Sequence, residues 1–301
     1  MANSIALAQQ FVPLLDETYQ QASLTSDLDG AADLARQGAN ANELIIPMMT
    51  MQGLGDYSRN SGYVEGDVTL TNETVTCNFD RGRMFTVDTM DNMETAGIAF
   101  GNLAGEFIRT KVVPELDAFR FSQYASADNI SKATAATLST GEDVIKALRA
   151  ATTKMDEDEV PMENRYLYIT PTLHGLIQDM DTTKSREVLA RFAKVVDVPQ
   201  TRFYTKIAQK SGKVITGGTD EAPTSTDETA GGYAKASEGK DINFMVIHKP
   251  AVIQFQKHVA PKIITPEQNQ SADAYKFGYH NVGVAKVYQN KAAGVYVHSK
   301  A

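Results

Sequence analysis

The sequence predicts an α+β fold that combines a long β-hairpin, a long helix, an inserted α/β region and a set of returning strands. Three patterns predict it. Residues 43–90 form two extended segments around a glycine-containing tip, residues 94–124 place apolar side chains at helical spacing, and residues 128–241 alternate helix and strand. The hairpin segment contains no second apolar layer, and an isolated two-stranded hairpin is marginally stable in water. We therefore expect this hairpin to rest on another subunit.

The segment before the hairpin is expected to be an arm. Apolar residues recur at helical spacing over residues 4–22, but Pro13 interrupts the pattern, which favours a short or bent helix. Residues 24–42 are polar and small, as is typical of an extended, weakly structured segment.

The return side of the hairpin carries the clearest strand signal. Apolar and polar side chains alternate with a period of two, which is typical of a strand with one buried face. The outgoing side, residues 44–51, is more uniformly apolar, and Pro47 indicates an edge or a bulge. The tip between them, residues 53–67, is expected to be flexible. The apolar positions of the return side are Val75, Cys77, Phe79, Phe85 and Val87.

The long helix should begin at Asp91, an N-cap residue, with Glu94 at the third helical position. A helix of thirty residues would span about 45 Å. Pro114 lies inside the pattern and should kink the helix or split it.

The rest of the chain predicts a mixed region and then strands. Helices are expected from Thr140 towards Lys154, from Pro171 onwards, and over residues 184–196, with a buried strand at 165–170. Residues 216–241 are rich in Gly, Ser, Thr and acidic residues, which predicts a long flexible loop. The C-terminal strands are expected at residues 242–248, 253–258, 274–288 and 294–298.

Composition argues against a protein that grips nucleic acid. The 301 residues are 42% hydrophobic and 22% charged, and the formal net charge is −8. A DNA-binding protein would usually present a basic surface. Acidity suits a soluble protein and would also suit the lining of a DNA container, because a basic lining would hold the genome too tightly.

The N-terminus and the cysteine content predict a protein that is soluble and intracellular when made. Its one cysteine, Cys77, excludes an intrachain disulfide and fits a reducing cytoplasm. The first residues lack the features of a signal peptide, and no apolar run approaches the roughly 20 residues that span a bilayer. We expect no membrane partner.

No arrangement of residues predicts catalysis, and we expect no enzyme, no cofactor and no metal site. The GLGDYS segment at 53–58 lacks the third glycine and the following helix of a dinucleotide loop, so a loop tip is the better interpretation. The five histidines have no zinc-binding spacing, and the acidic run 156–159 lacks the alternating ligands of a calcium loop. Cys77 lies on the apolar face of a strand, which favours packing over nucleophilic chemistry.

The charged residues near the long helix allow two interpretations. Arg81 and Arg83 flank Gly82, while Glu106 and Arg109 share a face of the helix at i, i+3. They could pair within the chain or remain solvated, or the arginines could clamp a neighbouring subunit. With the hairpin tip, they make up the expected intersubunit residues: Gly53, Gly55, Asp56, Tyr57, Arg59, Arg81, Arg83, Glu106 and Arg109.

Six segments, taken in order, resemble the major capsid proteins of tailed bacteriophages with the Hong Kong 97-like fold, particularly those of Gram-positive hosts. The resemblance covers the first 125 residues and the C-terminal end closely and the middle weakly. The segments are FVPLLDETYQQASLTSDL (11–28), GANANELIIP (38–47), QGLGDYSRNSGYVEGDVTL (52–70), DRGRMFTVDTMDNMET (80–95), LAGEFIRTKVVPELDAFRF (103–121) and ITPEQNQSADAYKFGYHNVGVAKVYQNKAAGVYVH (264–298).

The resemblance implies a division of the chain into parts of a capsid subunit. Residues 1–42 would be the N-terminal arm, 43–92 the E-loop hairpin that lies over an adjacent subunit, and 93–128 the spine helix of the P domain. Residues 129–241 would be the A domain, and 242–301 the P-domain strands and the C-terminus. Subunits would form hexamers and pentamers of an icosahedral head around double-stranded DNA, located in the virion and assembled in the bacterial cytoplasm.

The resemblance also implies partners. We expect a separately encoded scaffolding protein, because the arm motif begins at Phe11, together with a portal and a cement protein. Some family members join the E-loop to a neighbour by a lysine–asparagine isopeptide bond, but residues 43–91 contain no lysine. The packaged DNA would be held without sequence-specific binding. An encapsulin-type compartment shell is the alternative within the same fold.

Overall fold

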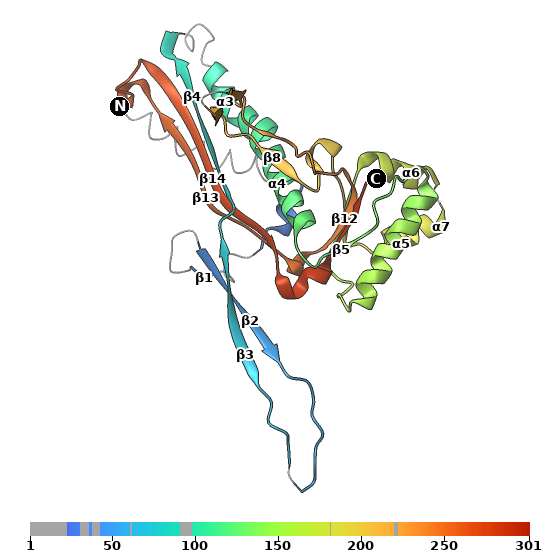
Figure 1. Ribbon diagram of the computed structural model, residues 1–301. Coiled ribbons are helices and arrows are strands. Elements are labelled where there is room, and N and C mark those ends of the chain that lie inside the picture. The colour runs from blue at the N-terminus through green and yellow to red at the C-terminus, as the bar shows by residue number, and fades with distance from the viewer. Residues whose placement is uncertain are drawn as a thin grey trace.

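A long helical segment lies along one face of a three-stranded antiparallel sheet, and together they form the centre of the molecule (Figure 1). The computed structural model describes residues 23–30, 36–37, 43–60, 62–90, 98–180, 182–219 and 222–301. The predicted helix at 4–22 and the predicted cap formed by Asp91 and Glu94 lie outside these residues.

The helical segment runs through Pro114 without breaking. Helix α3 (Ile98–Phe107) passes into a π-helical turn, η3 (Ile108–Val112), and then into α4 (Val113–Ser126). The N–H of Val113 donates to the carbonyl of Ile108, which is the longer spacing of a π turn. Proline has no N–H to donate and its ring crowds the preceding turn, so a widened turn accommodates it. The expected kink or split is thus a local widening.

The three-stranded sheet has the order β13 (Val252–Ile264), β14 (Ala274–Val287), β4 (Phe79–Asp88). Its helix-facing side is aromatic. The ring of Phe79 lies 5.0 Å from that of Phe119 on α4, and the ring of Phe85 lies 4.8 Å from that of Phe107 on α3. The period-two pattern of residues 79–87 therefore buries its apolar face against the helix of the same chain.

This pairing corrects the predicted hairpin. Strand β2 (Glu43–Met51) pairs with β3 (Val68–Thr76) from Glu43 opposite Thr76 to Met51 opposite Val68, and the pairing ends there. Beyond Thr76 the return strand continues as β4 and pairs with β14. The short strand β1 (Arg36–Gln37) borders β2. The β2–β3 hairpin projects from the body, and its tip is remote from the helices (Figure 1).

The junction between β3 and β4 is held by Asn78. Its side-chain amide donates to the carbonyl of Ala285 at 2.8 Å, and its side-chain oxygen accepts from the N–H of Ala285 at 3.0 Å. The side chain thereby makes the two hydrogen bonds to β14 that a strand backbone would make.

A five-stranded sheet lies beside this centre, in the order β5, β15, β12, β6, β7. Alternate residues of β6 face opposite sides. Leu167 packs with the helices α5, α6 and α7, whereas the ring of Tyr168 lies 5.2 Å from that of Phe121 on α4. The sheet is thus buried between two helical layers. The elements are β5 (Ser131–Lys132), α5 (Gly141–Glu157), β6 (Arg165–Ile169), α6 (Pro171–Met180), α7 (Thr183–Leu189), β7 (Lys194–Asp197), β12 (Ile242–His248) and β15 (Val295–Ser299).

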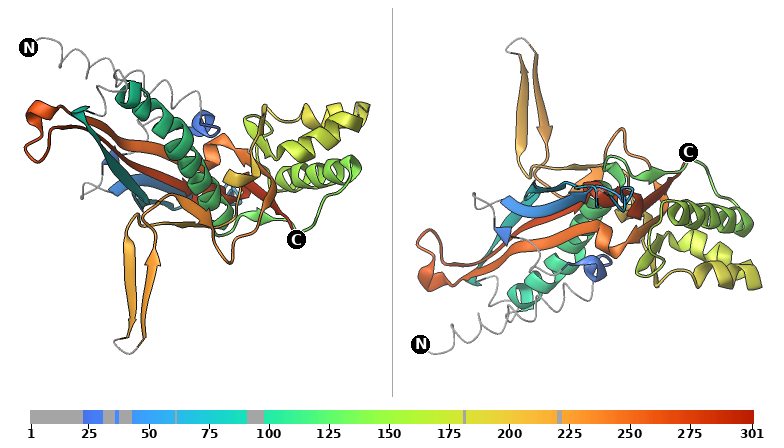
Figure 2. Two further views of the ribbon diagram at one scale, coloured as in Figure 1. Left: turned by 90° about the horizontal axis from the view of Figure 1, so that it is seen from above. Right: turned by 90° about the horizontal axis from the view of Figure 1, so that it is seen from below.

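Two predicted segments in this region are wrong. The helix expected over residues 184–196 ends at Leu189, and the chain then forms β7, parallel to β6. The flexible loop expected at 216–241 contains an antiparallel hairpin of β9 (Val214–Thr219) and β10 (Ala222–Asp227). Figure 2 shows this hairpin projecting from the body. At its base, β8 (Ile207–Gln209) pairs with β11 (Tyr233–Lys235).

The other helices and strands predicted after residue 139 are confirmed, with shifts of up to six residues at their ends. The helix from Thr140 is α5, whose first turn Thr140 caps by accepting from the N–H of Asp143. Short 3₁₀ turns are η1 (Ser26–Leu28), η4 (Gln200–Arg202), η5 (Lys249–Ala251), η6 (Pro266–Gln268) and η7 (Gln289–Gly294). Within the described ranges, no helix has both the length and the apolar character needed to cross a membrane.

Candidate assembly surfaces

The β2–β3 hairpin exposes an apolar stripe. Met49 lies directly opposite Leu70, and Met51 lies opposite Val68, so the four side chains share one face of the ladder. Their exposed fractions are 57% and 62% for the first pair and 71% and 61% for the second. Large apolar side chains exposed side by side on a projecting element mark a surface that binds a partner.

The tip of this hairpin carries five of the residues predicted to lie between subunits: Gly53, Gly55, Asp56, Tyr57 and Arg59. The rings of Tyr57 and Tyr63 are in contact, with 4.9 Å between their centroids and 56° between their planes. Leu54 is fully exposed and Tyr63 is 87% exposed. The tip therefore presents aromatic and aliphatic side chains next to acidic ones.

The four charged residues predicted near the helix all form contacts within the chain. Arg81 Nε lies 2.8 Å from Glu115 Oε1, and Arg83 donates to the backbone carbonyls of Thr229 and Ala230. Glu106 and Arg109 pair with each other at 2.8 Å on the exposed side of the helix. These contacts fit the intrachain interpretation; a role between subunits stays a prediction.

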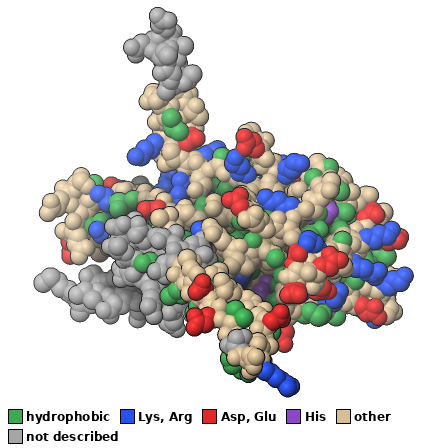
Figure 3. Space-filling model, turned by 60° about the horizontal axis from the view of Figure 1, so that its bottom comes forward, with side chains coloured by type: hydrophobic (Ala, Val, Ile, Leu, Met, Phe, Trp, Pro, Cys, Tyr) green, Lys and Arg blue, Asp and Glu red, His purple; other side chains and the backbone are tan. Residues whose placement is uncertain are grey.

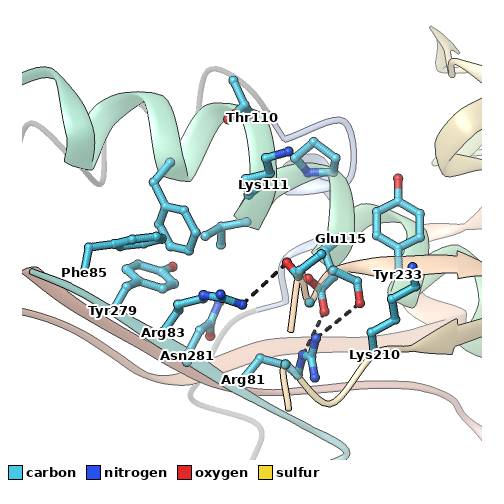
Figure 4. A pocket seen from close by; sticks show the side chains of 18 of the residues that line it. Arg81, Arg83, Phe85, Thr110, Lys111, Glu115, Lys210, Tyr233, Tyr279 and Asn281 are labelled. Carbon is cyan, nitrogen blue, oxygen red and sulfur yellow. Dashed lines mark hydrogen bonds and ion pairs between the residues drawn. The ribbon is translucent and has the colours of Figure 1, made fainter. Parts of the chain in front are cut away.

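A cavity of about 680 Å³ lies where the helix, the three-stranded sheet and the base of the β9–β10 hairpin meet (Figure 4). The π turn presents Thr110 and Lys111 to it, and β4 contributes Arg81 and Arg83. Its apolar part is made by Phe85, Phe107, Tyr279 and Leu103. This cavity could not be predicted from the sequence, because its walls come from segments that are far apart in the chain.

The titratable groups around the cavity are suited to binding. Burial raises the pKa of Tyr233 to about 12, so its phenol stays neutral and donates to the carbonyl of Thr201 at 2.9 Å. Hydrogen bonds from Ser211, with help from Lys210 and Arg81, lower the pKa of Glu228 and keep it ionised. Outside the cavity lining, burial raises the pKa of the Cys77 thiol, which disfavours the reactive thiolate. Across the described residues, no three His, Cys, Asp or Glu side chains are grouped to hold a metal.

The surface seen in Figure 3 mixes acidic and basic side chains, and neither sign gathers into a large patch there. This face lacks the continuous basic footprint of a protein that grips nucleic acid.

Comparison with known proteins shows similarity to solved structures but not to known sequences. No protein-family model and no curated protein sequence matches the chain. Solved structures match over most of its length. One is described as Mycobacterium phage Che8 (TM-score 0.56, 14% identity, covering 86% of this chain and 85% of that one). The capsid structure of the cyanophage P-SCSP1u has a TM-score of 0.53 and 14% identity, covering 88% of this chain and 85% of that one.

The chain has the Hong Kong 97-like capsid fold. The fold predicted from the sequence motifs is thus confirmed. A virus-like particle from Pyrococcus furiosus is also similar, with a TM-score of 0.53 and 11% identity, and the match covers 94% of this chain and 98% of that one. The Hong Kong 97-like fold therefore extends over both the helix-and-sheet centre and the five-stranded sheet.

Proposed function

We propose that this chain is the major capsid protein of a tailed phage or prophage. It assembles as hexamers and pentamers into an icosahedral head that encloses double-stranded DNA. The observation that carries the proposal is the β2–β3 hairpin, which exposes four apolar side chains in the described residues while projecting from a Hong Kong 97-like body. A hairpin of this kind gains stability by lying on an adjacent subunit.

The energetics favour assembly in many copies. Complete burial of one Met, Leu or Val side chain contributes roughly 1.5–3 kcal/mol, so the stripe alone gives a modest interface. A specific interface buries on the order of 1,000 Å² or more, which requires the body of the neighbour as well as the hairpin. Closed symmetry repeats the same contact around the shell and makes the assembly far more stable than one contact.

The proposal assigns a role to each part of the chain. Residues 1–42 act as the arm, 43–92 as the E-loop, 93–128 with 242–301 as the P domain, and 129–241 as the A domain. The nine residues predicted at the tip and near the helix lie at subunit contacts. A separate scaffolding protein, a portal and a cement protein take part in the cytoplasm of the bacterial host, and the product is the virion capsid.

The second candidate is a compartment shell of the encapsulin type, which houses a protein cargo. The similarity to the Pyrococcus furiosus virus-like particle, over nearly the whole of both chains, supports this second candidate. The two candidates differ in contents and in partners. Particles that package DNA only with a portal and a packaging enzyme support the phage head, whereas particles that enclose a protein encoded next to the chain support the compartment.

Expression followed by negative-stain electron microscopy tests the proposal. The chain is expressed alone and together with its neighbouring genes. Closed polyhedral or irregular shells are expected, with uniform size when the scaffolding protein is present. Uniform shells from the chain alone would contradict the separate scaffold. A monomer or dimer in every condition would contradict shell formation altogether.

A pair of variants tests the stripe. Met51→Asp places a charge among the four exposed side chains and is expected to abolish shells while the unassembled chain keeps its far-ultraviolet circular dichroism. Met162→Asp is the matched control, because Met162 is 54% exposed but lies outside the hairpin. If Met51→Asp formed shells at the same yield as the control, the four exposed apolar side chains of the hairpin would not be part of the assembly contact.

A further inference from the structure

We infer that the cavity between the helix and the three-stranded sheet is a receptor for the hairpin tip, residues 53–67, of a second copy of the chain. The inference rests on the proposed function, since it names the site at which one shell subunit holds the next. Three independent features of the cavity point to a peptide that carries apolar and acidic side chains.

The first feature is an apolar floor. The Phe107 ring lies 4.8 Å from that of Phe85 and 6.2 Å from that of Tyr279, measured between centroids, and all three rings line the cavity. A volume of about 680 Å³ is within the range of pockets that hold small molecules or peptide side chains. Such a floor fits an aromatic or aliphatic side chain.

The second feature is Asn281, on the central strand β14 opposite Arg81. Asn281 is 1% exposed and lines the cavity (Figure 4). Neither its amide nitrogen nor its amide oxygen has a hydrogen-bond partner among the described residues. Buried polar groups are nearly always paired, so this amide indicates a missing ligand. One peptide unit offers the acceptor and the donor that the amide needs, whereas a phosphate or carboxylate offers acceptors alone.

The third feature is charge. Arg81 is neutralised by Glu115, but Arg83 is bonded to backbone carbonyls, and Lys111 has no ion pair within the described part of the chain. Lys210 adds a further cation to the lining, whose two carboxylates, Glu115 and Glu106, pair with Arg81 and Arg109. The cavity therefore attracts acidic groups, although the chain as a whole has a formal net charge of −8.

The hairpin tip has the matching chemistry. It contains Asp56, Glu65 and Asp67 against one basic residue, Arg59, and it exposes Leu54 and the Tyr57–Tyr63 ring pair. Figure 1 places the tip of the hairpin away from the helix and from β4, so a tip cannot reach the cavity of its own chain. The occupant is therefore the tip of a neighbouring copy.

Directed cross-linking in assembled particles tests the inference. In a Cys77→Ala background, which removes the native thiol, one tagged chain carries Val64→Cys on the tip. A second chain with a different tag carries Thr110→Cys at the rim of the cavity. Thr86→Cys, an exposed threonine on the opposite face of β4, replaces Thr110→Cys as the matched control. The two chains are co-expressed, and the particles are purified and oxidised.

A disulfide-linked dimer that contains both tags is expected when Val64→Cys is combined with Thr110→Cys. No such dimer is expected when Val64→Cys is combined with the control Thr86→Cys. Intact particles without that dimer would overturn the inference and leave the shell function standing. Equal cross-linking of the control would also overturn it, because contact would then be unspecific. Absence of particles in the parent chain would overturn the proposed function and the inference together.

Charge exchange gives a second readout. Lys111→Glu is expected to lower the yield of particles because it repels Asp56 and Glu65 of the neighbour. Adding Glu65→Lys in the same chain is expected to restore the yield, since the pair is then reversed in sign. A yield that the second substitution lowers further would contradict direct contact between the tip and the cavity.

Discussion

Thr25 donates its hydroxyl to Asp117 Oδ1 at 2.7 Å, joining the N-terminal part of the described chain to the middle of helix α4. The carboxylate of Asp117 is completely buried, and it also accepts from the hydroxyl of Ser23 and the N–H of Leu24. Arg120, one turn further along the helix, donates to the same Thr25 hydroxyl at 2.8 Å. This buried network fixes residues 23–29 against the helix.

Asp117→Ala is expected to destabilise the unassembled chain by about 3–5 kcal/mol, because it leaves buried partners of the carboxylate unpaired. Denaturant unfolding measures the change. Glu142→Ala is the control, since Glu142 pairs with Lys146 on the surface of α5 and its loss should cost at most about 0.5 kcal/mol. Equal destabilisation by the two substitutions would show that the network contributes little.

The same substitution in two helices of the five-stranded region should have opposite effects. A Cβ on Gly141 would overlap the carbonyl oxygen of Leu176 and meet the sulfur of Met180 at 2.6 Å, so Gly141→Ala should destabilise the chain by about 1–3 kcal/mol. A Cβ on Gly175 would meet nothing within 4 Å, so Gly175→Ala should stabilise α6 by roughly 0.5–1 kcal/mol. The denaturant midpoints of the two variants and of the parent chain test both expectations. If Gly141→Ala raised the midpoint, α5 and α6 would have to be packed less closely than the structure shows.

Acid should weaken the five-stranded sheet through His298. Burial lowers the pKa of His298 below its usual 6.5, and its Nδ1 lies 3.0 Å from the amide nitrogen of Asn243. Below pH 6.5 the unfolded chain binds more protons than the folded one, so stability falls as the pH drops through this window towards the folded pKa. His298→Phe keeps a ring against Phe244 and should reduce the pH dependence. A thermal midpoint that falls equally in both proteins between about pH 7.5 and pH 5 would exclude His298 as the cause.

Assembled particles should dissociate into single chains in hot detergent. Residues 43–91 contain no lysine, so the hairpin cannot supply the lysine of a lysine–asparagine bond with a neighbour. Denaturing electrophoresis and intact-mass analysis are expected to give one species at 32.8 kDa. A ladder of covalent multiples would show that another segment supplies the lysine.

The sequence predicted the strands well but one of their partners wrongly. Apolar and polar residues alternate over 79–87, as expected of a strand. This alternation shows which face of the strand is buried, but it does not show whether the neighbouring strand is the other side of the hairpin or β14. An irregularity of the helix was predicted at Pro114 as a kink or a split, and it is instead the π turn at Ile108–Val112, whose form depends on the packing of both flanking helices. The valines of β7 fit a helical pattern and become a strand because β6 offers a parallel edge.

The candidate surfaces were predictable to different degrees. The exposed tip follows from glycines and polar residues at 53–67, which are local signals. The Glu106–Arg109 pair follows from helical spacing. The Arg81–Glu115 pair and the cavity could not be predicted, since Arg81, Glu115 and Lys210 meet through tertiary packing alone. For the cavity, the sequence offered one sign: Asn281 is a polar residue at an inward-facing position of an otherwise apolar strand.

The side chain of Asn78 has a consequence for the curvature of a shell. Its two hydrogen bonds to Ala285 align the root of the hairpin with the long sheet, so the root cannot swivel without breaking both of them. In the proposed shell, subunits at flat and at pointed positions would have to reach neighbours at different inclinations. In that shell the adjustment would be made farther out, by twisting and bending of the β2–β3 ladder about a root that Asn78 holds fixed.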